Sequence, residues 1–227
     1  MNAGLSDKRV LVTSGPTRAP LDAVRFISNR SSGRLGCAIA RELLSRGAYV
    51  TLIAGAGSVA PAPDELAEGE RGRLDLMRIE TVQELMDALK ETLEGEAPPD
   101  AVVHAMAVLD YLPESFDARK RPSGQGLWKL RLLPGPKVIE HIRRWAPQVC
   151  LVQFKLEVGV SEEYLVGRAQ ESLQRNSADL VVANDLERIS DWQHPALILG
   201  PDGTVLGRPH TREEIAAALC DALEEKI

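Results

Sequence analysis

The residues best suited to chemistry lie in a loop near the start of the chain. Ser31, Ser32 and Gly33 directly precede a stretch in which Leu35 and Ile39 begin an apolar pattern at helical spacing. They would therefore stand at the start of a helix, where free backbone N–H groups and the helix dipole bind anions and small side chains let a phosphate approach. An ordinary serine N-cap on a surface helix explains the same residues about as well.

Further polar residues follow apolar runs later in the chain. Asp110 comes just after the run 101–106, at the place where open α/β sheets form their ligand crevice. Three consecutive basic residues follow at 119–121, and their composition alone favours a solvated surface loop. Lys155 lies near the end of another apolar run, where a buried lysine needs an anionic partner.

The elements that must position these residues follow from the alternation of apolar runs with helical stripes. The runs predict strands at 9–13, 49–53, 75–80, 101–106, 150–156 and 180–183. The stripes predict helices at about 33–46, 81–93, 137–145 and 161–175, with a last helix near the end, and Thr81, Ser161 and Thr211 are the expected N-caps. The order predicts an α/β fold: a three-layer αβα, Rossmann-like arrangement with a mostly parallel, doubly wound sheet, in one domain spanning residues 1–227.

Four local expectations complete this picture. Residues 13–32 are expected to form one long loop, and residues 64–73 a flexible connection. Alternating apolar and basic residues predict a half-buried strand at 127–132. Residues 196–206 predict a small hairpin, because two apolar runs flank a Gly-Pro-Asp-Gly turn.

Composition excludes several classes. The formal net charge of −6 disfavours a general nucleic-acid or membrane surface, and no apolar run is long enough for a transmembrane helix. The three cysteines and four histidines have no metal-ligand spacing, and the cysteines fit buried apolar positions better than a disulfide framework. The chain also lacks a GxxxxGK[ST] loop and a GxGxxG fingerprint, so a bound nucleotide would need another loop design.

The long loop also carries a family resemblance. The string SGPTRAPLDAVRFISNRSSGRLG, residues 14–36, is similar to the signature of the phosphopantothenate–cysteine ligase family. Three later segments agree with that family: AVLDY at 107–111, FKLE at 154–157 and DLVVAND at 179–185. FKLE is typical of the eukaryotic branch, whereas many bacterial members have FAAE. The resemblance covers roughly residues 9–185.

The resemblance implies roles for individual residues. Asn29 would hydrogen-bond the acyl group and its developing oxyanion, and Lys120 would reach the triphosphate and the acyl intermediate, although Arg119 and Arg121 leave the register of that lysine open. The substrate- and phosphate-binding residues would be Gly15, Thr17, Arg25, Ser31, Ser32 and Gly33. The nucleotide-binding residues would be Ala105, Ala107, Asp110, Phe154, Lys155, Arg175 and Asn184. Phe154 could equally be a core aromatic, and Glu171 departs from the lysine that bacterial members carry there.

The implied reaction joins 4′-phosphopantothenate to cysteine through an acyl nucleotide, with CTP or ATP as the activating nucleotide and Mg²⁺ accompanying it. No flavin is expected, because the flavin-dependent decarboxylase that many bacteria fuse to this ligase does not appear in the sequence, which therefore resembles the stand-alone form. The resemblance further implies a homodimer in the cytoplasm with small molecules as its partners. The alternative is a catalytically inactive nucleotide- or phosphopantothenate-binding module of the same fold.

Overall fold

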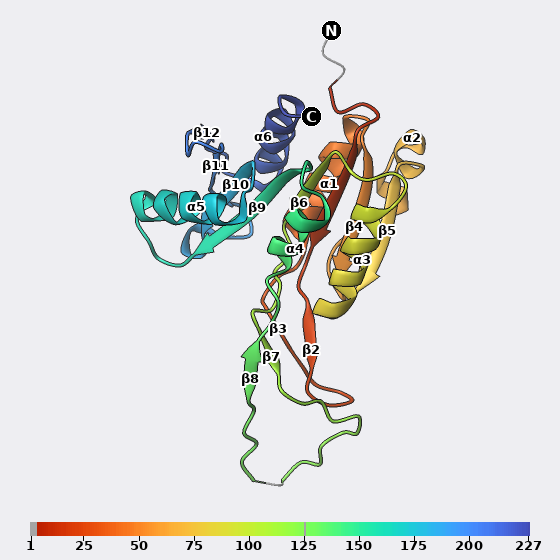
Figure 1. The fold of residues 1–227 in the computed structure, drawn as a ribbon, viewed down its shortest axis with the longest axis vertical. Helices are drawn as coiled ribbons and strands as arrows, with labels where there is room; N and C mark the ends of the chain where they lie inside the picture. Colours follow the sequence, from red (N-terminus) through yellow and green to blue (C-terminus); the bar gives the residue numbers. More distant parts are fainter. Residues whose placement is uncertain (1–3, 125) are drawn as a thin grey trace.

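A computed structural model describes residues 4–124 and 126–227. Within these residues, an eight-stranded sheet has the order β12-β11-β10-β9-β6-β1-β4-β5 (Figure 1). Six of its strands are parallel: β1 (Arg9–Ser14), β4 (Tyr49–Gly55), β5 (Leu74–Ile79), β6 (Ala101–His104), β9 (Cys150–Glu157) and β10 (Leu180–Asp185). The predicted hairpin supplies the antiparallel edge, β11 (Ala196–Leu199) and β12 (Val205–Gly207).

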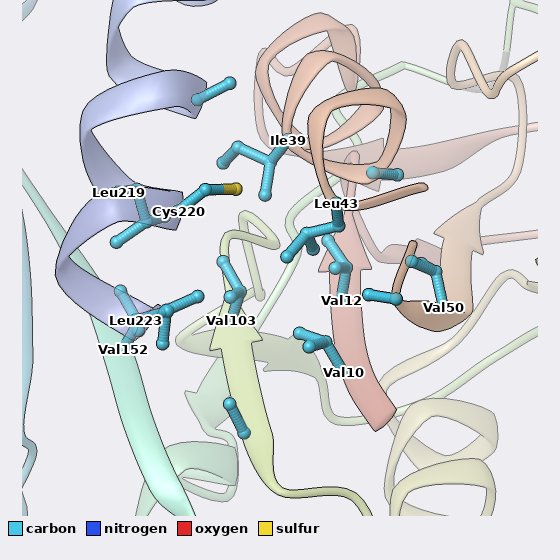
Figure 2. Packing of buried hydrophobic residues seen from close by; sticks show 14 of the residues in the cluster. Val10, Val12, Ile39, Leu43, Val50, Val103, Val152, Leu219, Cys220 and Leu223 are labelled. Atoms are coloured by element: carbon cyan, nitrogen blue, oxygen red, sulfur yellow. The ribbon is translucent and has the colours of Figure 1, made fainter. Parts of the chain in front are cut away.

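Helices cover both faces of this sheet, so the predicted three-layer α/β fold is confirmed. One face packs against α1 (Arg34–Ser45) and α6 (Arg212–Glu224), and the other against α3 (Val82–Glu94), α4 (Val138–Trp145) and α5 (Glu162–Asn176). Alternate strand residues face the two layers, so that Val10 and Val12 point to α1 and α6 whereas Leu11 points to α3 and α4. Figure 2 shows the first of these cores, where Leu43 of α1 and Leu223 of α6 meet the valines of β1 and its neighbours.

The predicted helix caps are confirmed at three positions. Thr81 accepts a hydrogen bond from the backbone N–H of Glu84, and Glu84 reaches back to complete a capping box. Ser161 and Thr211 likewise accept backbone N–H groups from the first turns of α5 and α6. Within α5 the apolar residues Leu165, Ala169 and Leu173 are buried, whereas Tyr164 is exposed.

An arm built from two small hairpins extends from the body of the molecule (Figure 1). One hairpin pairs β2 (Arg18–Pro20) with β3 (Phe26–Ser28), and the other pairs β7 (Tyr111–Pro113) with β8 (Leu132–Pro134). The expected single loop at 13–32 therefore contains a hairpin. The strand predicted at 127–132 is also wrong: among the described residues of this stretch only Leu132 pairs, and Leu127 and Leu130 are exposed.

The connection expected to be flexible at 64–73 contains a short helix, α2 (Glu68–Arg71), preceded by a 3₁₀ turn at Pro63–Glu65. Glu65 and Glu70 each accept a hydrogen bond from the backbone N–H three residues earlier, which closes both turns. No helix of the described chain is both long and apolar enough to span a bilayer.

Candidate functional site

The start of α1 lies against the end of β1. Gly33 occupies the N-cap position with φ +76°, and no side chain caps the helix, so the interpretation of Ser31 or Ser32 as an ordinary N-cap is wrong. The hydroxyl of Ser14 donates to the carbonyl of Gly33 at 3.0 Å and so ties the strand to the helix start. The first N–H groups of α1 are therefore left without a side-chain acceptor, which is the arrangement that binds an anion.

A cavity of about 360 Å³, here called the first cavity, opens at this helix start. It brings together eight of the predicted site residues: Gly15, Ser31, Ser32, Gly33, Ala105, Ala107, Phe154 and Asn184. Arg30, Arg34 and Arg212 also line it, and none of the described residues in its wall is acidic. Arg34 is paired with Asp191 at 3.6 Å, so the positive character of the first cavity comes mainly from Arg30, Arg212 and the helix start, and it fits a phosphate or another strongly anionic group.

A second cavity of about 300 Å³ lies on the side of the sheet that carries α4 and α5. It contains the predicted nucleotide residues Asp110, Lys155 and Arg175, and it shares Phe154 and Met106 with the first cavity. The first and second cavities therefore meet at Phe154, whose side chain is only partly buried and lies between them. This position fits contact with a ligand that extends from one cavity to the other.

Two charged groups of the second cavity already have partners. The ammonium of Lys137 lies 2.5 Å from a carboxylate oxygen of Asp110, and that of Lys155 lies 3.0 Å from Glu157. The anionic partner that a half-buried Lys155 requires is thus Glu157. The hydrogen bond from Lys155 is the main cause that lowers the pKa of the Glu157 carboxyl below its usual value.

Buried polar groups underlie both cavities. His104 accepts or donates a 2.8 Å hydrogen bond with the hydroxyl of Thr13, and its burial lowers its pKa to about 4. His194, in the wall of the first cavity, lies 2.8 Å from the amide nitrogen of Asn184, and its burial, aided by the charge of Arg212, also lowers its pKa to about 4. Both imidazoles are therefore neutral at pH 7.

Thr17 and Asn29 hold the segment that follows β6. The hydroxyl of Thr17 is buried and accepts the backbone N–H of Leu109 at 3.0 Å. The amide nitrogen of Asn29 donates to the carbonyls of Ala107 at 3.4 Å and Val108 at 3.0 Å. Neither side chain is in the wall of either cavity, and both fix the backbone that the cavities share.

Arg25 and Lys120 lie on the arm and line neither cavity. Arg25 pairs with Asp22 at 2.5 Å, and Lys120 is exposed in the loop that joins β7 to β8. The structure thus separates the predicted residues into a group at the cavities and a group on the arm.

Sequence reasoning missed Arg30, Arg34, Arg212 and His194 as cavity residues. Arg30 and Arg34 flank the Ser-Ser-Gly motif, so their position beside it could have identified them as cavity residues. Arg212 and His194 come from the far end of the chain, and only the packing of α6 and the β10–β11 connection brings them to the cavity. Within the described residues, no cluster of three or more His, Cys, Asp or Glu side chains is arranged to hold a metal ion.

Comparison with known proteins places this geometry in a family. The family model of the "DNA/pantothenate metabolism flavoprotein C-terminal domain" matches residues 5–226. The coenzyme A biosynthesis bifunctional protein CoaBC of Thermococcus kodakarensis is 39% identical over 223 residues, which cover 98% of this chain and 52% of that protein. The chain thus spans about half the length of the curated relatives it matches.

Comparison with solved structures supports the same family. A DNA/pantothenate metabolism flavoprotein from Streptococcus pneumoniae superposes with a TM-score of 0.84 at 31% identity, covering 97% of this chain and 100% of that chain. The C-terminal domain of a coenzyme A biosynthesis bifunctional protein CoaBC superposes with a TM-score of 0.76 at 27% identity, covering 99% of this chain and 97% of that one. The resemblance found in the sequence is therefore confirmed, and the chain belongs to the DNA/pantothenate metabolism flavoprotein C-terminal domain family.

Proposed function

We propose that this chain forms a ligase domain that joins 4′-phosphopantothenate to cysteine in coenzyme A biosynthesis, with CTP or ATP as the activating nucleotide. Family membership supports the reaction class, because curated relatives such as the one from Thermococcus kodakarensis are coenzyme A biosynthesis proteins. The observation that carries the proposal is the first cavity, which joins an uncapped helix start to three arginines beside the partly buried Phe154.

The chemistry has two steps. A carboxylate oxygen of phosphopantothenate attacks the α-phosphorus of the nucleotide, the bond to pyrophosphate breaks, and an acyl nucleotide forms. The amine of cysteine then attacks the acyl carbon, the nucleoside monophosphate leaves, and the ammonium loses a proton. Neither step needs a covalent enzyme intermediate, so the protein contributes positioning and charge stabilisation.

We assign the ligands to the two cavities as follows. The N–H groups at Ser31, Ser32 and Gly33 bind a phosphate group. The nucleotide occupies the crevice that Phe154 divides, with Ala105, Ala107, Asp110, Lys155, Arg175 and Asn184 around it. Asn29 holds the backbone of this crevice through the carbonyls of Ala107 and Val108, and the family resemblance assigns it to the acyl group and its developing oxyanion as well.

Mg²⁺ is proposed to enter with the nucleotide. The arginine-lined first cavity has no carboxylate among its described residues, and the second has only Glu140 and Asp110 among those described, of which Asp110 is paired with Lys137. Such surroundings fit an ion that phosphate oxygens and water hold, rather than one held in a protein cage. The ion would offset triphosphate charge at the reacting phosphorus.

The arm supports a homodimer. Its loop carries exposed apolar side chains, including Phe116, Leu127 and Leu130, and an exposed apolar surface of this kind fits a protein interface. Arg25 and Lys120, which line neither cavity, would then reach the site of a second copy. Light scattering at micromolar concentration should give twice the chain mass, and a monomer would contradict the dimer.

The cytoplasm is the proposed compartment, since nucleoside triphosphates are plentiful there and all three cysteines are free thiols.

The function is tested by incubating the protein with phosphopantothenate, cysteine and either CTP or ATP, and detecting phosphopantothenoylcysteine by mass spectrometry. Product that requires a nucleotide is the expected result. Thermal stabilisation by CTP or ATP without any product would favour the inactive binding module.

A further inference from the structure

A buried carboxylate lies at the junction of the arm's two halves. The side chain of Asp22, in the turn between β2 and β3, has no exposed surface although the arm around it is open to solvent. Its oxygen Oδ1 accepts the backbone N–H groups of Val24 and Arg25, both at 2.8 Å. Its other oxygen, Oδ2, accepts the guanidinium of Arg25 at 2.5 Å and the backbone N–H of Arg121 at 3.2 Å.

The two oxygens therefore have separate tasks. The Oδ1 bonds are local and close the turn of the β2–β3 hairpin. The Oδ2 bonds reach across to Arg121, which lies 99 positions further along the chain, in the loop that joins β7 to β8. A single carboxylate thus connects the hairpin to the basic loop.

Four other contacts converge on the same junction. The guanidinium of Arg25 donates to the carbonyl of Arg121 at 3.3 Å, so Arg121 is held through both its N–H and its C=O. The guanidinium groups of Arg25 and Arg121 lie 5.5 and 4.9 Å from the ring centre of Trp128. The backbone N–H of Asp117 also donates to the carbonyl of Leu21 at 3.2 Å.

We propose that Asp22 is a positioning residue that docks the basic loop onto the hairpin and thereby fixes the place of Lys120. Lys120 is adjacent to the clamped Arg121, and consecutive Cα atoms are about 3.8 Å apart, so holding Arg121 restricts the backbone from which the lysine extends. The side chain of Lys120 itself stays exposed and free to meet a ligand. This inference rests on the proposed function, in which Lys120 neutralises the triphosphate.

The charge on Asp22 is an integral part of the clamp. Burial disfavours the charged carboxylate, but the N–H groups of Val24, Arg121 and Arg25 together with the Arg25 guanidinium outweigh it, so the pKa of Asp22 lies below its ordinary value of 3.8. The carboxylate is therefore ionised at every pH at which the enzyme would be assayed. Among the described residues, no other carboxylate forms a hydrogen bond or an ion pair with Arg121.

Asp22→Asn tests the clamp selectively. The carboxamide keeps the size of the side chain and one oxygen for the two local N–H groups, but it places an NH₂ where Oδ2 faced two donors. The hairpin turn should survive while the bonds to Arg25 and Arg121 are lost. The matched control is Asp117→Asn in the same loop, because among the described residues the carboxylate of Asp117 accepts only the neighbouring N–H of Arg119.

Trypsin measures the opening of the clamp without any ligand, since it cleaves after Arg119 and Lys120, directly before the clamped Arg121, whose own bond to Pro122 resists it. Losing charge-assisted hydrogen bonds should raise the open population of the loop, and with it the cleavage rate, by about 10-fold or more. Mass spectrometry of the fragments locates the cut, and the melting temperature verifies that both variants are folded. Wild-type cleavage rates in a folded Asp22→Asn protein would overturn the clamp, as would equal acceleration in Asp117→Asn.

Turnover tests the positioning role. At saturating substrates Asp22→Asn should lower kcat, whereas in a Lys120→Gln background it should cause little further loss, because the residue it positions is already gone. Additive losses in the double variant would contradict positioning of Lys120. Absence of turnover in the wild-type protein would overturn the proposed function, while the ligand-free trypsin result still decides the clamp.

Discussion

Gly36→Ala tests how closely the anion site depends on the contact between α1 and β1. Gly36 lies in the first turn of α1, and a Cβ built on it would lie 2.5 Å from Cβ of the buried Ser14 and closer still to its hydroxyl oxygen. Ordinary contact begins at 3.4 Å, so the helix start must shift by up to about 1.2 Å or Ser14 must move. Ser14 is tied to the carbonyl of Gly33, so either movement disturbs the N–H groups of the first cavity.

The magnitude follows from overpacking, which costs about 1–3 kcal/mol when a methyl group is forced into a filled site. Alanine also has the better helix propensity, by up to about 1 kcal/mol, and this gain must be separated from the overlap. Gly167→Ala in α5 is the matched control, because its added Cβ meets nothing within 4 Å. The two variants share the propensity gain, so their difference isolates the overlap.

Thermal unfolding and calorimetric titration with inorganic pyrophosphate or CTP measure the two consequences. Gly36→Ala should melt about 2–12 °C below Gly167→Ala, which is the shift that about 1–3 kcal/mol gives in a chain of this length. It should also bind the anion more weakly, whereas Gly167→Ala should bind as the wild type does. Equal stability and equal affinity in the two variants would refute the close packing and the assignment of the anion site to this helix start.

The remaining predictions concern catalysis and pH. Asn29→Asp should lower turnover about 10²-fold, the scale of one oxyanion donor, and near wild-type turnover at saturating substrate would make Asn29 purely structural. Lys120→Gln should slow acyl-nucleotide formation more than Arg119→Gln does, and the reverse order in rapid-quench experiments would shift the register of the catalytic lysine. The free energy of unfolding should fall as the pH is lowered from about 6.5 towards 4, because His104 stays neutral in the folded protein while the unfolded chain binds the proton. One such group contributes a slope of up to about 1.4 kcal/mol in the free energy of unfolding per pH unit. Urea titrations at several pH values should show a smaller slope in His104→Gln but not in His141→Gln.

The sequence predicted most of the body because its strands are buried on both faces. Runs such as 101–103 and 180–183 are continuous and apolar, which is what a central parallel strand requires. Local capping chemistry at Thr81 and Ser161 was equally readable, since the partners lie three residues away. Such signals are contained within one element and do not depend on the rest of the fold.

The arm could not be predicted in the same way. The alternation at 127–132 indicates two unlike faces, but a strand also needs a partner, and among the described residues the pairing with β7 begins only at Leu132. The hairpin inside the first loop has strands of three residues, too short for a periodic signal. Its usable clue was Asp22, because an aspartate that accepts the N–H groups two and three residues later marks a turn.

The part of the candidate site formed by neighbouring residues in the sequence was predictable, whereas the residues that come from distant parts of the chain were not. Ser31, Ser32 and Gly33 form one motif, and the structure places them together in the first cavity. Arg212 and His194 reach the same cavity from the last part of the chain, and no spacing in the sequence relates them to residue 33. Long-range packing of α6 creates that proximity, so only the fold reveals it.

The central claim, that this chain activates phosphopantothenate as an acyl nucleotide, is tested most directly without cysteine. Protein at high concentration is mixed with phosphopantothenate and α-labelled CTP or ATP, quenched within seconds, and analysed for pyrophosphate and for labelled acyl nucleotide. The expected result is a burst of both products, stoichiometric with the protein, followed by release of nucleoside monophosphate when cysteine is added. Release of inorganic phosphate and a nucleoside diphosphate instead, or no cleavage of either nucleotide, would contradict the account.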